Sequence, residues 1–358
     1  MNIALLSYST KPRGGVVHTL ALAEALAAAG QDVTVWTLGR GGDGRFFREV
    51  DPRVRLRIVP FPEGGAHESV GQRILRSIAT LRGAFDPAPY DIVHAQDCIS
   101  ANAVDRCVRT VHHLDHFTTP ELAACHERAI VHPYAHICVS SAVAGELAAG
   151  WGIKATVIPN GVDHARFAST DPAARARWTD RLGGYVLTVG GIEPRKGSLD
   201  LLEAYALLRA GHPRIRLVIA GGETLFDHRD YRARWEARAA VLGVEPVVLG
   251  QVPDDDLPSL VAAADVFAFP SVKEGFGLAA MEALAAGVPL VVRDLPVLRE
   301  VFGPAARFAA TPEALAAELD GALTGGDETR RAAGLDLAAR HTWSEAARRH
   351  LDFYADLG

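Results

Sequence analysis

The first forty residues alternate between strand-like and helix-like hydrophobic patterns. Two short apolar runs, at 2–8 and 32–38, have the length of buried strands. Between them, residues 16–29 repeat their apolar side chains at helical spacing, and Gly30 follows. A glycine-containing loop at 9–15 joins the first run to this helix. The pattern predicts a βαβ unit, the building block of a parallel sheet.

The same alternation continues to residue 158 and starts again at Tyr185. Helical stretches such as 199–209 lie between strand-like runs that are rich in β-branched residues. These runs are 54–60, 91–94, 107–111, 136–139, 155–158, 185–189, 215–220, 247–249, 266–269 and 290–292. Two such series predict an α/β protein with two Rossmann-like domains, each a parallel sheet covered by helices on both faces.

The domain boundaries are predicted from the segments where the alternation of strand-like and helix-like patterns is interrupted. Residues 159–180 are loop-like and are predicted to join an N-terminal domain, 1–168, to a C-terminal domain, 169–342. The tail, 343–358, begins with a helix that has Ala347, Leu351 and Tyr354 on one side. The pattern leaves its partner open, and packing back on the N-terminal domain is one option.

Size and charge narrow the classes of function. A chain of 358 residues exceeds what one hydrophobic core usually organises. The net charge of −6 provides no basic field, so nucleic acid is not an expected partner. No signal peptide or transmembrane segment is predicted, which favours a cytoplasmic location and still allows peripheral contact with a membrane. The cysteine spacings match neither a zinc site nor a disulfide scaffold.

The stretch 269–282 has the form of an anion site. It reads as a strand end, a turn with Gly275 and Gly277, and a helix start. At such a point the free N–H groups of the helix attract phosphate oxygens. The segment also contains two acids, Glu274 and Glu282, and is followed by the sequence Ala-Gly-Val-Pro at 286–289.

Together these residues resemble the signature of family 4 glycosyltransferases. The resemblance implies the GT-B fold, in which two Rossmann-like domains face a central cleft. It also implies retaining transfer of a sugar from a nucleoside diphosphate sugar to a hydroxyl acceptor, without a metal or other cofactor. The acceptor and the nucleotide base stay open.

The resemblance assigns donor-binding roles within this stretch. Glu274 would contact hydroxyls of the donor sugar, and Glu282 would hold the nucleotide ribose. Backbone at the intervening residues would meet the diphosphate or the sugar; these are Gly275, Phe276, Gly277 and Leu278. The two acids do not suit a retaining glycosidase, because eight residues of helix rise roughly 12 Å and such enzymes hold their carboxyl groups about 5 Å apart.

A second loop, 189–197, also resembles the family. Lys196 falls at the position of the lysine that grips the donor diphosphate. The arginine common after the first glycine of this turn is replaced by Gly191, which stays in the expected donor-binding set. Arg195 is therefore expected to supply the second cation. Two cations would stabilise the charge that grows on a departing diphosphate.

Three further positions complete the predicted donor site. Gly14 and Gly15 open the first helix and would approach the donor phosphate or the acceptor. Backbone near Val252 would meet the base.

The turn at 158–163 resembles the segment at which the family's chain passes between domains. The run Asp254–Asp256 is interpreted as helix-start acids rather than a metal motif.

The histidine-rich string at 110–116 has two interpretations. In the family, a histidine matched by His112 contacts the donor sugar, and Asp115 and His116 would then lie on the acceptor side. Alternatively, His113, Asp115 and His116 form a zinc site of a hydrolase, although Val111 stands where that motif needs its first histidine. A third alternative, an inactive nucleotide-sugar-binding module, stays open because of Gly191.

Overall fold

The computed structural model describes residues 1–65, 67–115, 117, 119–222 and 228–357. These residues form two compact units. Unit 1 comprises residues 1–161 and 343–358, and unit 2 comprises residues 162–342. The division falls seven residues before the expected boundary at 168, because α6 (His164–Ala168) packs against helices of unit 2.

Unit 1 contains a seven-stranded parallel sheet with the strand order β3-β2-β1-β4-β5-β6-β7. Its strands are β1 (Asn2–Leu6), β2 (Asp32–Arg40), β3 (Arg55–Phe61), β4 (Ile92–Ala95), β5 (Val108–Val111), β6 (Ala135–Cys138) and β7 (Thr156–Val157). Its helices are α1 (Gly14–Ala28), α2 (Val70–Ala84), α3 (Cys98–Ala103), α4 (Pro120–Val131), α5 (Ser141–Trp151) and α15 (Trp343–Ala355). This is the doubly wound order, in which the direction of winding reverses between β1 and β4.

Unit 2 contains a six-stranded parallel sheet with the order β10-β9-β8-β11-β12-β13. Its strands are β8 (Tyr185–Val189), β9 (Arg216–Ala220), β10 (Val247–Gly250), β11 (Val266–Phe269), β12 (Leu290–Arg293) and β13 (Arg307–Ala309). Besides α6, its helices are α7 (Pro172–Leu182), α8 (Ser198–Leu208), α9 (Arg229–Leu242), α10 (Leu257–Ala262), α11 (Leu278–Ala285), α12 (Pro296–Phe302), α13 (Pro312–Thr324) and α14 (Glu328–Arg340). Short 3₁₀ turns lie at η1 (Pro194–Lys196), η2 (Asp254–Asp256) and η3 (Gly303–Ala305).

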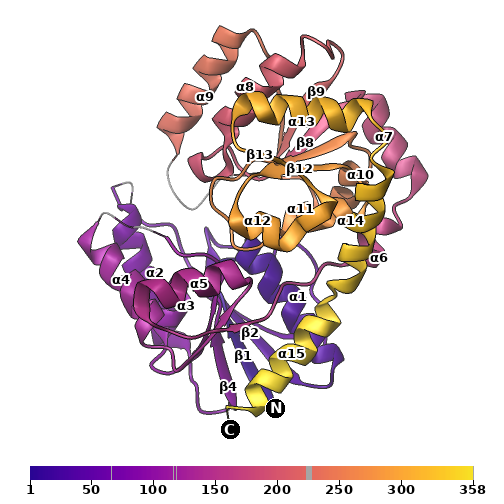
Figure 1. Cartoon of the computed structure of the whole chain (residues 1–358). Coiled ribbons are helices and arrows are strands. Elements are labelled where there is room, and N and C mark those ends of the chain that lie inside the picture. Colours follow the sequence, from indigo (N-terminus) through magenta and orange to yellow (C-terminus); the bar gives the residue numbers. More distant parts are fainter. Residues whose placement is uncertain (66, 116, 118, 223–227, 358) are drawn as a thin grey trace. The chain divides into compact units, whose positions relative to one another are not determined.

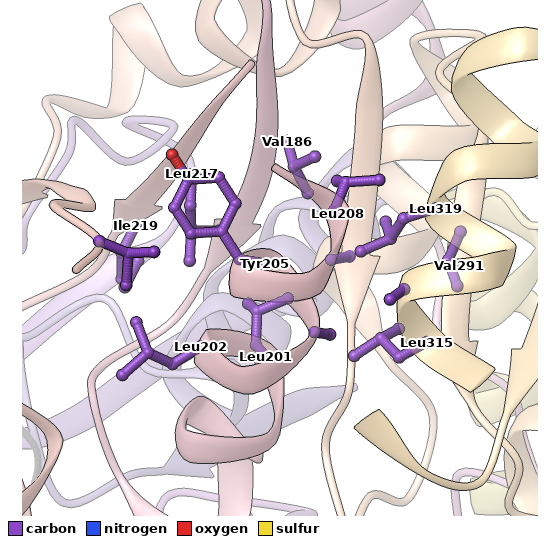
Figure 2. Packing of buried hydrophobic residues seen from close by; sticks show 14 of the residues in the cluster. Val186, Leu201, Leu202, Tyr205, Leu208, Leu217, Ile219, Val291, Leu315 and Leu319 are labelled. Carbon is purple, nitrogen blue, oxygen red and sulfur yellow. The ribbon is translucent and has the colours of Figure 1, made fainter. Parts of the chain in front are cut away.

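Helices pack against both sheets, as the apolar runs predict. In unit 2, α8 and α13 pack side by side on the sheet, where Leu201 and Leu319 are fully buried among strand residues such as Leu217 (Figure 2). In unit 1, α15 packs along α1 (Figure 1). Tyr354 belongs to the same core as Ile3 of the first strand. The C-terminal tail therefore completes unit 1.

The expectation of a loop at 159–180 is wrong. Helices α6 and α7 occupy most of it. They escape a hydrophobic-pattern search because α7 buries only Leu182 and α6 only Phe167. Capping aspartates mark both starts: Asp163 accepts from the N–H of Arg166 at 3.2 Å and Asp171 from the N–H of Ala173 at 3.1 Å. Among the helices that the structure describes, none has both the length and the apolar character needed to cross a bilayer.

Candidate active site

Two predicted donor loops meet at the switch point of the unit 2 sheet. The loop containing Lys196 follows β8, and the loop containing Glu274 follows β11, the neighbour of β8 in the sheet. In open α/β sheets, ligands bind beyond the carboxyl ends of strands at such a reversal of winding. The fold therefore places the two loops side by side where a ligand crevice is expected.

The side chains of these loops form one charged cluster. Lys196 Nζ lies 2.6 Å from Glu274 Oε1, and Arg195 Nη1 donates to the same oxygen at 3.0 Å. Arg195 also contacts Glu193 Oε1 at 3.1 Å. The Lys196 ammonium sits 5.0 Å from the ring centroid of Phe269, the last residue of β11. The carboxylates hold both cations in place before any ligand arrives.

Glycines make the approach of these loops possible. Gly197 has φ +64°, and a Cβ there would lie 2.2 Å from the carbonyl oxygen of Pro270. Gly277 has φ +99° and caps α11 without a side-chain hydrogen bond. The first N–H groups of α11, starting at Leu278, are thus left to other acceptors, an arrangement that suits a phosphate group.

Glu282 lies inside α11 in a different electrostatic setting. Burial raises the pKa of its carboxyl to about 8, with Asp254 and Asp163 adding to the shift and Arg166 opposing it. Arg166 itself is paired with Asp254, at 2.7 Å between Nη2 and Oδ2. Because α11 begins only at Leu278, Glu274 is not helical, and the expected rise of a continuous helix between the two acids does not apply.

His112 lies directly after β5 in unit 1. Its ring approaches α1: a Cβ built on Gly15 would meet His112 Cδ2 at 3.7 Å. Its Nε2 atom is buried and has no hydrogen-bond partner among the described residues. Burial, followed by repulsion from Arg109, holds the pKa of His112 well below its usual value, so the ring is neutral at pH 7. A neutral imidazole with one uncommitted nitrogen can exchange a hydrogen bond with a ligand.

The remaining predicted residues are spread more widely. Gly14 opens α1, and a Cβ there would meet nothing within 4 Å, so the packing of unit 1 does not require a glycine. Gly191 follows β8, and Gly275 and the buried Phe276 precede α11. Val252 lies two residues beyond β10, which β9 separates from β8.

The alternative metal cluster is only partly within the described residues. His113 Nε2 lies 3.2 Å from Asp115 Oδ2, an ion pair when the histidine is protonated. His116 lies outside the described residues. Within the described part of the chain, no group of three or more histidine, cysteine or acidic side chains is arranged to hold a metal ion.

Comparison with known proteins decides the family. Residues 182–349 match the family described as glycosyl transferases group 1, and residues 12–166 match glycosyltransferase family 4. The phosphatidyl-myo-inositol mannosyltransferase of Mycolicibacterium smegmatis is 30% identical, over 94% of this chain and 89% of its own length. The chain belongs to glycosyltransferase family 4.

A second relative and a solved structure agree with the assignment of this chain to a glycosyltransferase family. The D-inositol 3-phosphate glycosyltransferase of Salinispora arenicola is 32% identical over 81% of this chain and 75% of its own. The structure of Anabaena HepE in complex with UDP and glucose superposes with a TM-score of 0.77 at 20% identity, covering 99% of each chain. The predicted GT-B fold and a transferase of the glycosyltransferase class are confirmed, and neither the hydrolase nor the inactive module is favoured.

Two residues beside the site of this glycosyltransferase are not indicated by the motif resemblance. Glu193 shares Arg195 with Glu274, although it lies in the glycine-rich loop already singled out. Arg166 lies on α6, in the stretch taken for a loop, and its charge acts on Glu282. The Asp163 cap was the available signal for that helix.

Proposed function

We propose that this glycosyltransferase takes its sugar from a nucleoside diphosphate sugar and transfers it to a hydroxyl acceptor with retention of anomeric configuration and without a metal ion. The observation that carries the proposal is the Lys196–Arg195–Glu274 cluster beside the uncapped start of α11. The UDP-bound Anabaena structure, which shares the fold, supports the choice of a nucleotide sugar.

In this proposal the cations act on the leaving diphosphate. The bond from the anomeric carbon to the diphosphate oxygen breaks, and the acceptor oxygen bonds to the same face of that carbon. The acceptor's proton passes to the departing diphosphate oxygen, so no protein nucleophile is needed. Lys196 and Arg195 neutralise the charge that develops there, and the N–H groups beginning at Leu278 add backbone donors.

The other residues orient the donor. Glu274 holds the two cations and contacts sugar hydroxyls, while Glu282 accepts or donates a hydrogen bond at the ribose. His112 presents its neutral ring to the sugar. Asp115 and His116 stay assigned to the acceptor side, and backbone at Val252 to the base. Correct orientation of bound groups is itself a large part of such a rate acceleration.

Thermal unfolding tests the donor site. UDP, GDP and ADP are compared, each with and without a chelator, and the nucleotide that stabilises the protein identifies the base. A ligand at 100 times its Kd adds about 2.7 kcal/mol. Lys196→Ala should abolish most of this gain, whereas Lys154→Ala, an exposed lysine of unit 1, should keep it.

Two outcomes would contradict the proposal. Stabilisation by no nucleotide would remove the donor site, and stabilisation that disappears with chelator would remove metal independence. Once the sugar is known, NMR of the product reports whether the anomeric configuration is retained or inverted.

A further inference from the structure

Two arginines of unit 1 share one tyrosine ring. Tyr8 follows β1, Arg13 precedes α1, and Arg40 ends β2. The guanidinium carbons of Arg13 and Arg40 lie 5.7 and 5.5 Å from the centroid of the Tyr8 ring. Arg13 Nη1 also donates to the Tyr8 hydroxyl at 3.2 Å. Two like charges are thus gathered at the carboxyl edge of the sheet.

Within the described part of the chain, the hydrogen-bond partners of this arginine pair, Arg13 and Arg40, are neutral. Arg40 donates to the carbonyl oxygen of Tyr8 at 3.1 Å and to Ser77 Oγ at 3.0 Å. Neither arginine is ion-paired with a carboxylate of the described residues, and Arg13 Nε is buried there without a partner. Both side chains are half-buried. A cation that is partly withdrawn from water without a paired carboxylate is costly, which points to an anion from outside.

Two neighbouring basic residues, in contrast to the arginine pair, have carboxylate partners. Lys11 lies 2.9 Å from Asp43, and Arg76 lies 2.6 Å from Glu68. Both belong to the same region of unit 1, on the β1–α1 loop and on α2. The missing counter-charge at the arginine pair is therefore not a general feature of basic residues in this unit.

The other charges that face the pair leave it positive. Burial, with repulsion from Arg73 on α2 and from Arg13, lowers the pKa of Arg40 to about 10. Two acids act on Arg40: Asp97, after β4, and Glu68, which also interacts with Arg73. Burial raises the pKa of the Asp97 carboxyl. Asp97 Oδ1 accepts the Ser100 N–H at 2.8 Å. Glu68 is already paired with Arg76, so Asp97 is left as the counter-charge near Arg40, against the three guanidinium groups of Arg13, Arg40 and Arg73.

We infer that the arginine pair binds a phosphoryl group carried by the acceptor. The inference rests on the proposed function, in which unit 1 receives the acceptor, and it adds the acceptor's chemical class. Guanidinium groups match the oxygens of a phosphoryl group with paired N–H donors. A doubly charged phosphoryl group would balance both members of the pair. The site adjoins β1 and β4, where the winding of this sheet reverses.

Binding of inorganic phosphate is the direct test. The full chain is first saturated with the nucleoside diphosphate that stabilises it, so that the unit 2 phosphate site is filled, and phosphate is then titrated by ³¹P NMR. Arg13→Gln and Arg40→Gln should each weaken phosphate binding at least tenfold. Lys11→Gln, two residues from Arg13 but paired with Asp43, is the matched control and should change binding less than twofold.

Equal weakening in all three variants, or no weakening in Arg13→Gln, would overturn the inference. Thermal unfolding of each variant shows whether it is folded, and Arg40→Lys, which keeps the charge, should recover part of the binding lost in Arg40→Gln. Nucleotide binding is measured on the same samples. If the unmodified chain binds no nucleotide, the proposed function is contradicted. If it binds nucleotide but not phosphate, only this inference is contradicted.

Vesicles distinguish a lipid headgroup from a soluble phosphate ester. If the chain sediments with phosphatidylglycerol vesicles and not with phosphatidylcholine vesicles, and Arg13→Gln weakens this sedimentation, the result supports the site and assigns the phosphate to a lipid. Phosphate binding that depends on Arg13 without sedimentation supports the site with a soluble ester.

Discussion

The ring of His18 meets the ring of His112 edge to face, with centroids 4.7 Å apart. His18 Nδ1 lies 2.9 Å from Asn160 Oδ1, and the ring also packs edge to face on Trp343 of α15. His18 is fully buried, so its position is set by these contacts. Through the ring contact, α1 and α15 fix where His112 lies.

Replacing His18 with alanine should therefore impair both stability and catalysis. Leaving Asn160 without its buried partner should lower the free energy of unfolding by about 1–3 kcal/mol. A displaced His112 should lower kcat at least about tenfold, measured well below the unfolding temperature. His67→Ala, at an exposed position, should change neither quantity; an unchanged kcat in His18→Ala would show that His18 does not position His112.

Unit 1 should be acid-sensitive because it buries several neutral histidines. Burial holds the pKa values of His18, His94 and His112 well below their usual value and lowers that of His350 to about 4. The unfolded chain takes up these protons near pH 6.5, whereas the folded chain does not. Stability should accordingly fall as pH drops from 6.5 towards 4, by about 1.4 kcal/mol per pH unit for each proton.

Denaturant unfolding measured across this pH range checks the prediction. His350→Leu removes one of the four groups, and the pH dependence should weaken by about one proton. His67→Ala serves as the control. A pH dependence identical to that of the unmodified chain in His350→Leu would mean that this histidine is protonated in the folded state.

Glu282 should produce the opposite trend at higher pH. Its folded pKa of about 8 exceeds the usual 4.5, so the folded state holds a proton that the unfolded state has lost. The free energy of unfolding should fall as pH rises from 4.5 to 8. Glu282→Gln, which cannot ionise, should show a flatter dependence in that window. Parallel curves for the two proteins would place the carboxylate in a more solvated setting.

Gly197→Ala should be strongly destabilising. The left-handed backbone at this position costs an alanine about 1–3 kcal/mol, and the clash with Pro270 adds to it. Gly14→Ala is the matched control, since its Cβ meets nothing within 4 Å and alanine favours the helix that starts there. Urea unfolding compares the two; equal stability in both would show that the loop after β11 can move away from Gly197.

The strands could be predicted from sequence because both sheets are parallel and buried. The runs at 185–189 and 266–269 coincide with β8 and β11 residue for residue, since covered strands read as continuous apolar segments. By contrast, β13 was missed, because it has three residues and begins with Arg307. Helix α7 was missed because most of its residues face solvent, although Asp171 and Pro172 mark its start.

The candidate site could be predicted only in part. Motif resemblance selected Lys196, Glu274 and His112, but contact between Lys196 and Glu274 depends on which strands are neighbours. Local pattern carries no information about that order. The setting of Glu282 likewise depends on Arg166, which is distant in sequence, and the ring contact of His18 with His112 depends on how α1 meets the end of β5.

Because α15 completes unit 1, the two halves of the chain cannot finish folding in the order in which they are synthesised. Tyr354 donates or accepts a 2.6 Å hydrogen bond with His94, a residue 260 positions earlier. At about 5–20 residues per second, ribosomes need roughly 10–50 s to cover that distance. Unit 2 is an uninterrupted segment and emerges whole within this interval. Until α15 has left the ribosome, His94 lacks its partner Tyr354 and His18 lacks its contact with Trp343, so unit 1 cannot complete its core.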